Sequence, residues 1–322
     1  MPDDINGLPD DFVLPFQIET SGARGRILRM GPAITEVLEK HDYPEPVSAL
    51  LGEAMALTAM LGAALKFDGK FILQTTGNGP VSFIVAQYYP PGKIRGYASY
   101  DSAALEDIVK LNGSSHGNHV NLLGDGHLAM TIDPGPGLDR YQGIVPLEGN
   151  NLSQAADLYF HQSEQLPTFI RIAVARQYEA GKQDQAGAWS WRAGGLLVQK
   201  LTAEGGVPGR HNGGDPEEAW NRAQMLAQTV EDHELLDPML ASERLLYRLF
   251  HEERVRVFDA SAITAQCQCS RTSVKSVLAS FSQEELAEMA EDGRVEVKCE
   301  FCNSRYHFDA GEIAADDDGG LN

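Results

Sequence analysis

The chain has 322 residues, of which 43% are hydrophobic and 22% charged, a composition typical of a soluble globular protein with two or three domains. Its formal net charge of -20 opposes nucleic-acid binding, which depends on Lys and Arg side chains that neutralise phosphates. No apolar run approaches the ~20 residues that span a bilayer, and the acidic start MPDDINGLPD does not resemble a signal peptide. We therefore expect a cytoplasmic protein that binds neither nucleic acid nor membranes.

The first 201 residues predict one domain in which helices pack on a mostly antiparallel sheet. Apolar positions recur at helical spacing over residues 47–66 and again over 152–165. Short β-rich runs separated by Gly and Pro indicate an antiparallel meander, and one sheet with helices on it is the expected architecture. The predicted strands cover residues 12–19, 26–30, 71–74, 81–89, 94–100, 128–132, 143–147, 168–177 and 189–201.

Residues 202–256 predict a metastable helical linker. The segment opens with a Gly-rich and Pro-rich run from Glu204 to Asp215, which cannot hold a regular element. A helix follows over residues 217–234, and its few large apolar residues mean that it needs tertiary contacts to persist. A second helix over residues 242–253 is firmly amphipathic.

Residues 257–322 predict a small α/β-hairpin module. Val274 and Phe281 begin and end a run of apolar residues at helical spacing, and Ser282 with Glu285 forms a capping box for the next helix, which Gly293 is expected to stop. Alternating residues on both sides of positions 299–302 predict a β-hairpin with a turn at its tip. The acidic, Gly-rich end from residue 315 predicts a disordered tail.

All four cysteines of the chain lie within this module. Cys267 and Cys269 form a C-x-C pair, and after 29 residues Cys299 and Cys302 form a C-x2-C pair. In a cytosolic protein, such clustering favours metal or redox chemistry over structural disulfides. Four thiolates suit a tetrahedral Zn²⁺ site, so we predict one structural zinc ion; His307, between apolar neighbours in a strand, is expected to face solvent instead.

The energetics of the module indicate a switch. A unit of about 60 residues is marginally stable without help, whereas a structural zinc contributes ~10–16 kcal/mol. Oxidation is expected to pair sequence neighbours, Cys267 with Cys269 and Cys299 with Cys302, and so to expel the metal. The module would then unfold, and the linker would lose its support.

The sequence gives only weak indications of a nucleotide site or a catalytic nucleophile. Residues 77–80 are Gly-rich but lack the Gly-Lys-Ser/Thr ending of a phosphate loop, so a hairpin turn is expected and no nucleotide. Ser114, Ser115, His116 and His119 lack a nucleophile elbow, and we expect no enzyme. Two alternatives to a switch remain: a zinc ribbon that recruits nucleic acid or a protein, and a thiol-disulfide oxidoreductase.

The sequence resembles the 33 kDa chaperonin family, the redox-regulated heat-shock holdases of the bacterial cytosol, over nearly the whole chain. In the C-terminal module the resemblance rests on Cys267-Gln-Cys269-Ser270-Arg271 and Cys299-Glu300-Phe301-Cys302. Upstream it rests on Ala23-Arg24-Gly25-Arg26, Leu65-Lys66-Phe67-Asp68-Gly69, Gly79-Pro80-Val81, Arg95-Gly96-Tyr97-Ala98, Thr131-Ile132-Asp133-Pro134-Gly135, Arg140-Tyr141-Gln142-Gly143-Ile144-Val145, Leu147-Glu148-Gly149 and Ser163-Glu164-Gln165-Leu166-Pro167-Thr168.

The resemblance implies an ATP-independent chaperone that is inactive when reduced and zinc-bound. Oxidants form two disulfides and release zinc, the linker unfolds, and the protein dimerises and holds unfolding client proteins. Carried over by position, Cys267, Cys269, Cys299 and Cys302 are the zinc ligands and redox centres. The chain departs from the family pattern at Thr272, where Glu is common, and in the Gly-rich insertion of the linker.

Overall fold

The computed structural model describes residues 10–65, 69–112, 120–135, 137–149, 151–179, 187–201, 215–309 and 312–313. The chain divides into two compact units, Met1–Ala265 and Gln266–Asn322. The predicted Gly-rich run over 204–214, the predicted tail from 315 and the Ser/His group at 114–119 lie outside the described residues. Among the helices that the structure does describe, none has the length and apolar character needed to span a membrane.

The first sheet of the large unit is antiparallel and has the strand order β10-β1-β2-β9-β8, with β11 paired to β1. Its centre joins distant parts of the sequence, since Arg24 of β2 lies opposite Gln199 of β9. These strands are β1 (Asp11–Ile18), β2 (Arg24–Met30), β8 (Thr168–Glu179), β9 (Ala188–Gln199), β10 (Val255–Val257) and β11 (Ser261–Ala262).

A second sheet contains the predicted meander and has the order β12-β5-β4-β3-β6-β7. Its pairs are antiparallel except for β12, which runs parallel to β5. The expectation of one sheet was therefore wrong, because local patterns do not specify which strands pair. The strands are β3 (Lys70–Gly77), β4 (Val81–Tyr89), β5 (Lys93–Tyr100), β6 (Gly126–Asp133), β7 (Tyr141–Pro146) and β12 (Thr264–Ala265).

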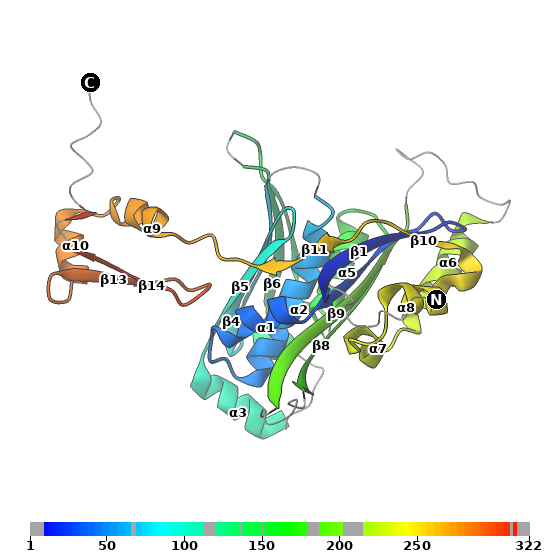
Figure 1. Ribbon diagram of the computed structural model, residues 1–322, viewed down its shortest axis with the longest axis horizontal. Helices are drawn as coiled ribbons and strands as arrows, with labels where there is room; N and C mark the ends of the chain where they lie inside the picture. Colours follow the sequence, from blue (N-terminus) through cyan, green and yellow to red (C-terminus); the bar gives the residue numbers. More distant parts are fainter. Residues whose placement is uncertain are drawn as a thin grey trace. The chain divides into compact units, whose positions relative to one another are not determined.

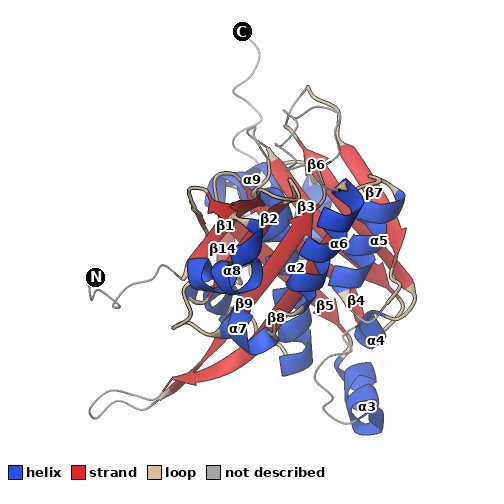
Figure 2. Cartoon of the chain, turned by 90° about the vertical axis from the view of Figure 1, so that its right-hand side faces the viewer, coloured by secondary structure: helices blue, strands red, loops and turns tan. Residues whose placement is uncertain are grey.

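Helix α2 (Glu45–Gly62) lies between the two sheets and forms the centre of the main core (Figures 1 and 2). Every residue from Val47 to Gly62 is buried, as expected for a helix that is apolar on all sides. Helix α5 (Leu152–Gln162) packs beside it. Sequence reasoning missed α1 (Pro32–Glu39), α3 (Ser102–Asn112) and the single turn α4 (Val120–Leu123).

A carboxylic acid lies inside this core. Glu53 of α2 is fully buried, and its Oε1 accepts hydrogen bonds from the backbone N–H (3.2 Å) and hydroxyl (3.4 Å) of Ser153 at the start of α5. Its other oxygen has no hydrogen-bond partner among the described residues. Burial raises the pKa of Glu53 to about 7, although hydrogen bonds from Ser153 and Leu152 oppose the shift.

We expect Glu53 to make the large unit less stable at neutral than at mildly acidic pH. Between pH 4.5 and about 7, the unfolded chain releases this proton while the folded chain keeps it, so stability falls as the pH rises. The full loss is about 3 kcal/mol, since each pKa unit corresponds to about 1.4 kcal/mol. Urea unfolding of Glu53→Gln and the parent at pH 5 and pH 8 measures the effect. The variant should lose this pH-dependent component, and an unchanged difference between the two pH values would contradict the assignment.

Three helices cover the outer face of the first sheet, and we call α6, α7 and α8 the linker helices. In Figures 1 and 2, α7 and α8 lie beside β8 and β9. A second core forms there, combining Phe16, Ile27 and Leu196 of the sheet with Trp220 and Phe250 of the helices. The helices are α6 (Pro216–Gln228), α7 (Asp232–Leu236) and α8 (Ser242–Phe250), and a 3-10 turn follows at His251–Glu253.

The small unit contains two helices and the predicted β-hairpin. Its elements are α9 (Arg271–Leu278), α10 (Gln283–Met289), β13 (Arg294–Lys298) and β14 (Arg305–Asp309). The predicted capping box at Ser282 is present. The prediction that Gly293 stops the helix was wrong: α10 ends at Met289, and Gly293, with a φ of 76°, lies in the turn that opens β13. The small unit begins at Gln266 rather than at the predicted residue 257, because residues 255–265 pair with β1 and β5.

Candidate metal centre

The structure brings the four predicted cysteines together. Cys267 and Cys269 lie in the segment before α9, whose N-cap Ser270 accepts a hydrogen bond from the backbone N–H of Ser273. Cys299 and Cys302 lie in the turn that joins β13 to β14. The C-x-C pair thus precedes the N-terminus of a helix, where the aligned peptide dipoles favour negatively charged thiolates.

The spacing of the sulfurs suits a tetrahedral metal. All four Sγ atoms lie within 4.8 Å of one another, with 3.7 Å between Cys267 and Cys299 and 3.3 Å between Cys269 and Cys302. Four sulfurs at the Zn–S distance of about 2.3 Å from one centre stand roughly 3.8 Å apart. The donor set consists of soft thiolates, which Zn²⁺ accepts readily. The residues therefore fit a zinc ion.

Hydrogen bonds at the tip of the hairpin distinguish the thiols from one another. Burial raises the pKa of Cys269 to about 12, although the Tyr306 hydroxyl, which donates to its sulfur at 3.2 Å, opposes the shift. Burial also raises the pKa of Cys299. At Cys302, burial acts in the same direction, but hydrogen bonds with Ser304 and with neighbouring thiols outweigh it and lower the pKa to about 6. The lowered pKa favours the thiolate form of Cys302, and a thiolate is the form that reacts with oxidants.

Arg271 links the helix that follows the C-x-C motif to the strand that follows the C-x2-C motif. Its Nη1 donates to the backbone carbonyl of His307 at 2.8 Å, and Nη2 is paired with Glu312 at 2.8 Å. The guanidinium also lies 4.4 Å from the centre of the buried Phe308 ring. One side chain thus ties the start of α9 to β14. Sequence comparison included Arg271 in a family block but gave it no role, because its partners are about 40 residues away.

His307 lies outside the sulfur cluster, as expected. Its side chain is 59% exposed, and Nδ1 lies 3.6 Å from a carboxylate oxygen of Glu296 on the neighbouring strand. The buried positions of this hairpin are Val295 and Phe308, which alternate with exposed residues. The metal candidates among the described residues of this unit are thus the four cysteines.

The sulfur distances do not by themselves favour the predicted disulfides. Two close sulfur contacts join the motifs, at 3.7 Å between Cys267 and Cys299 and at 3.3 Å between Cys269 and Cys302. A disulfide between the motifs would close a loop of more than 30 residues and cross-link the folded unit, which would stabilise it. A bond within a motif would leave the two halves of the unit free to separate. The pairing therefore determines whether oxidation stabilises the unit or opens it.

The model of the family described as Hsp33 protein matches residues 11–309. This chain belongs to the Hsp33 family. A 33 kDa chaperonin of Caulobacter vibrioides is 44% identical over 304 residues, covering 94% of this chain and 96% of the relative. One of Shewanella loihica is 37% identical over 306 residues, covering 95% of each. A crystal structure of the Thermotoga maritima 33 kDa chaperonin, covering 95% of this chain and 97% of that one, has a TM-score of 0.74 at 22% identity and shows the same fold.

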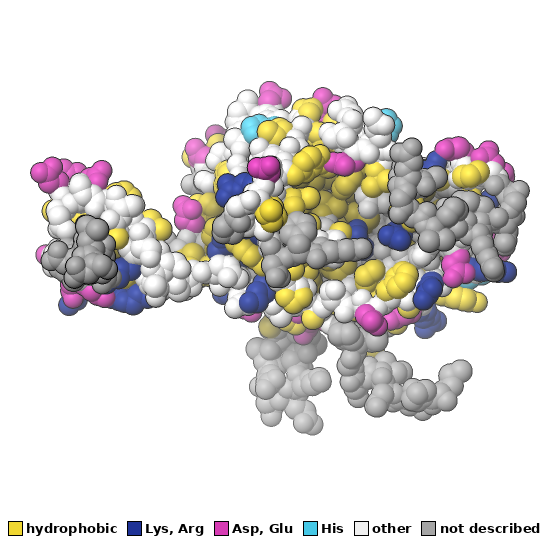
Figure 3. Space-filling view, turned by 90° about the horizontal axis from the view of Figure 1, so that it is seen from above, with side chains coloured by type: hydrophobic (Ala, Val, Ile, Leu, Met, Phe, Trp, Pro, Cys, Tyr) yellow, Lys and Arg dark blue, Asp and Glu magenta, His cyan; other side chains and the backbone are white. Residues whose placement is uncertain are grey.

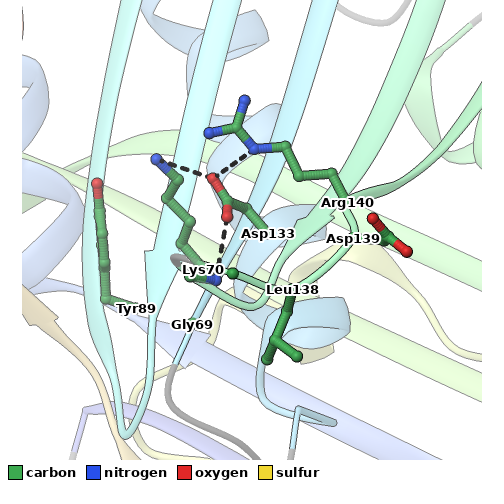
Figure 4. A pocket seen from close by; sticks show the side chains of 9 residues that line it. Gly69, Lys70, Tyr89, Asp133, Leu138, Asp139 and Arg140 are labelled. Carbon is green, nitrogen blue, oxygen red and sulfur yellow. Dashed lines mark hydrogen bonds and ion pairs between the residues drawn. The ribbon is translucent and has the colours of Figure 1, made fainter.

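Three of the Hsp33 family blocks meet at a hollow in the large unit (Figure 4). Asp133 accepts a hydrogen bond from the backbone N–H of Gly135 at 3.1 Å and pairs with Lys70 at 3.4 Å and Arg140 at 3.1 Å. The hydrogen bond from Gly135 is the main cause of the lowered pKa of Asp133. Because the carboxylate pairs with both cations and accepts a hydrogen bond from the turn after β6, it has a structural role, and the three groups together keep a net charge of +1.

The basic residues of the small unit are balanced by acidic ones. Arg271 pairs with Glu312, Arg294 with Asp309 at 3.1 Å, and Arg305 with Glu296 at 2.5 Å. Figure 3 shows both acidic and basic side chains on this unit, at the left. A nucleic-acid site needs an unbalanced basic face. The described part of the unit does not provide one.

Proposed function

We propose that this chain is a redox-regulated, ATP-independent chaperone that holds unfolding proteins under oxidative stress. The observation that carries the proposal is the cluster of four thiols in a small unit whose core has few residues. That core contains only five buried apolar side chains among the described residues: Leu278, Leu286, Val295, Phe308 and Ile313. A core of this size is marginal without a metal. The names of the chain's relatives, 33 kDa chaperonin, support the chaperone activity.

In the reduced state, Cys267, Cys269, Cys299 and Cys302 hold one zinc ion. When bound, the ion supplies folding free energy and keeps the four sulfurs as thiolates. Tyr306 and Ser304 orient the sulfurs of Cys269 and Cys302 through their hydrogen bonds. The reduced unit is therefore folded, and the chain is inactive.

Oxidation removes the ligands in pairs. Each disulfide forms when two thiolates lose two electrons; one molecule of peroxide accepts these electrons together with two protons from solvent and becomes two molecules of water. We propose the pairs Cys267–Cys269 and Cys299–Cys302. As the unit loosens, cysteines separated by one or two residues stay close, whereas the two motifs drift apart, so loop closure favours pairing within each motif. The site then has no thiolates left for a metal.

Unfolding of the small unit can spread along the chain to the linker helices. Residues 255–265 connect α8 to Gln266 through three strands of only two or three residues each. Such short strands make few ladder hydrogen bonds and are weakly held. We propose that residues 202–256 act as a metastable linker, which detaches next and exposes the apolar face of the first sheet. Unfolded clients then bind, and activation is accompanied by homodimer formation in the cytoplasm.

One experiment tests the proposal in the full chain. The zinc-loaded protein is treated with peroxide at raised temperature, while zinc release and aggregation of an unfolding client are followed together. We expect zinc release and suppression of aggregation to rise in parallel, with no requirement for nucleotide. Mass spectrometry of proteolytic fragments should find Cys267 joined to Cys269 and Cys299 joined to Cys302. Zinc loss without suppressed aggregation would contradict the chaperone proposal.

The rival functions predict other outcomes in the same samples. A zinc ribbon would bind nucleic acid or a protein partner in the reduced form, and an oxidoreductase would turn over a small disulfide. A disulfide between the motifs would contradict the opening mechanism, because that bond would hold the unit together after zinc has left.

A further inference from the structure

The outer face of the first sheet contains three arginines among its apolar residues. Arg29 of β2 and Arg192 of β9 are 3% and 5% exposed, and Arg171 of β8 is partly exposed. Side chains two residues apart on a strand share a face. Arg192 therefore lies on the same face as Leu196, and Arg171 on the same face as Ala173, both of which belong to the core beneath the linker helices. We call Arg29, Arg171 and Arg192 the arginine cluster.

The linker supplies most of the hydrogen-bond partners of this cluster. Arg29 donates to the backbone carbonyls of Asp237 at 2.5 Å and Leu240 at 2.7 Å. Arg192 donates to the carbonyl of Leu236 at 2.9 Å and also pairs with Asp10. Arg171 pairs with Asp232 of α7 at 2.8 Å.

The cluster lies around a place where the linker contacts the sheet closely. Gly194 of β9 lies opposite both Arg29 of β2 and Ala173 of β8. A Cβ atom on Gly194 would lie 2.1 Å from the carbonyl oxygen of Leu235 in α7. Burial lowers the pKa of Arg29, and Arg192 lowers it further, while Asp10, Asp237 and Glu243 oppose the shift. The two buried cations thus repel each other; Asp10 compensates the charge of Arg192, whereas Arg29 relies on carbonyl groups of the linker.

The segment that covers this face is acidic as well as apolar. Residues 215–253 contain ten Asp and Glu residues against three Arg and no Lys. The same segment contributes Trp220, Leu235, Leu245, Leu249 and Phe250 to the shared core. The face is therefore complementary to an amphipathic segment that combines large apolar side chains with carboxylates and free carbonyl groups.

We propose that the arginine cluster makes the exposed face selective for client segments in which apolar residues are interspersed with Asp or Glu. This inference rests on the proposed release of the linker. Once the linker leaves, Arg29 loses two acceptors, Arg192 one, and Arg171 its carboxylate partner, while only Asp10 remains among these partners. Uncompensated guanidinium groups beside an apolar surface favour carboxylates, with which they form paired hydrogen bonds.

The overall negative charge of the chain works against a preference for acidic clients, so it makes the proposal a strict one to test. A net charge of -20 would by itself attract basic clients and repel acidic ones. Selectivity for acidic segments therefore requires the attraction between the arginine cluster and nearby carboxylates to exceed the long-range repulsion from the net negative charge. The long-range part is screened over about 10 Å at 0.1 M salt.

Three labelled peptides of about 20 residues test this selectivity; they share one helical pattern of Leu and Phe and carry Glu, Gln or Lys at the polar positions. Their affinities for the fully oxidised full-length chain are measured by fluorescence anisotropy at 0.1 M salt. We expect the Glu peptide to bind about fivefold more tightly than the Lys peptide, since Arg29 and Arg171, which lose their partners, each contribute roughly 0.5 kcal/mol, whereas Arg192 keeps Asp10. Equal binding, or preference for the Lys peptide, would overturn the inference. Failure to bind any peptide after the linker has been shown to be released would instead contradict the proposed function.

Three variants test whether the cluster causes the preference. Arg171→Gln should reduce the preference about two- to fivefold. Arg176→Gln is its matched control, because Arg176 lies on the same strand with the same 39% exposure but pairs with Glu45 on the opposite face; it should leave the preference unchanged. Asp232→Asn breaks the same ion pair as Arg171→Gln but keeps the arginine, so it should not reduce the preference. Equal losses in Arg171→Gln and in either Arg176→Gln or Asp232→Asn would overturn the role of the cluster.

Discussion

Replacement of Cys299 by Ser is expected to weaken zinc binding on the order of a hundredfold and to leave the small unit largely unfolded at low zinc. Four thiolates share an apparent binding free energy of ~10–16 kcal/mol, so the loss of one costs about 3 kcal/mol. The five-residue core cannot compensate for such a loss. Competition with a chromogenic chelator measures the affinity, and amide hydrogen exchange over residues 266–309 measures the folding.

Ser304→Ala is the matched control for this prediction. Its hydroxyl is hydrogen bonded with the sulfur of Cys302 at 3.3 Å but is not among the metal candidates. Zinc affinity should therefore change little, whereas the rate of thiol alkylation in the metal-free protein should fall, because this hydrogen bond helps to lower the pKa of Cys302. If Cys299→Ser kept both the parent zinc stoichiometry and a protected small unit, the four thiols would not be the metal site.

The grouping of the four cysteines could be predicted from the sequence because the signal was local. Two short cysteine motifs and the alternating residues of a β-hairpin place two sulfurs before a helix and two at a hairpin tip, and the structure brings the four together. Strand β4 has the predicted bounds, and the capping box at Ser282 was visible in four consecutive residues. The role of Arg271 was hidden because its partners, His307 and Glu312, are distant in sequence.

Long-range contacts account for most of what sequence reasoning missed in the fold. Helix α1 has no side-chain cap of its own, and the carboxylate of Asp11 instead accepts from the backbone N–H groups of Gly31 and Ala33. The division into two sheets depends on pairing β2 with β9, which no local pattern specifies. Helix α3 is different: Asp101 accepts from the N–H groups of Ala103 and Ala104, so a recognisable N-cap was present and overlooked.

Removal of the Phe250 side chain should open the linker without any oxidant. Phe250 ends α8 fully buried, with its ring centre 5.8 Å from that of Phe16 in β1. Truncation of such a residue to Ala costs about 3–5 kcal/mol. The loss of stability should affect α6, α7 and α8 first, because these helices pack on the core that contains Phe250 rather than on the main core around α2. Hydrogen exchange of the linker amides should accelerate while α2 stays protected.

Tyr247→Ala provides the comparison on the same helix, since Tyr247 is 65% exposed and its removal should change stability by less than about 0.5 kcal/mol. If the linker gates client binding, reduced and zinc-bound Phe250→Ala should suppress client aggregation, whereas reduced Tyr247→Ala should not. The decisive comparison is between linker opening and activity in the same sample. A Phe250→Ala chain whose linker exchanges rapidly, yet which remains inactive until oxidised, would show that the small unit controls the chaperone by a route other than the linker helices.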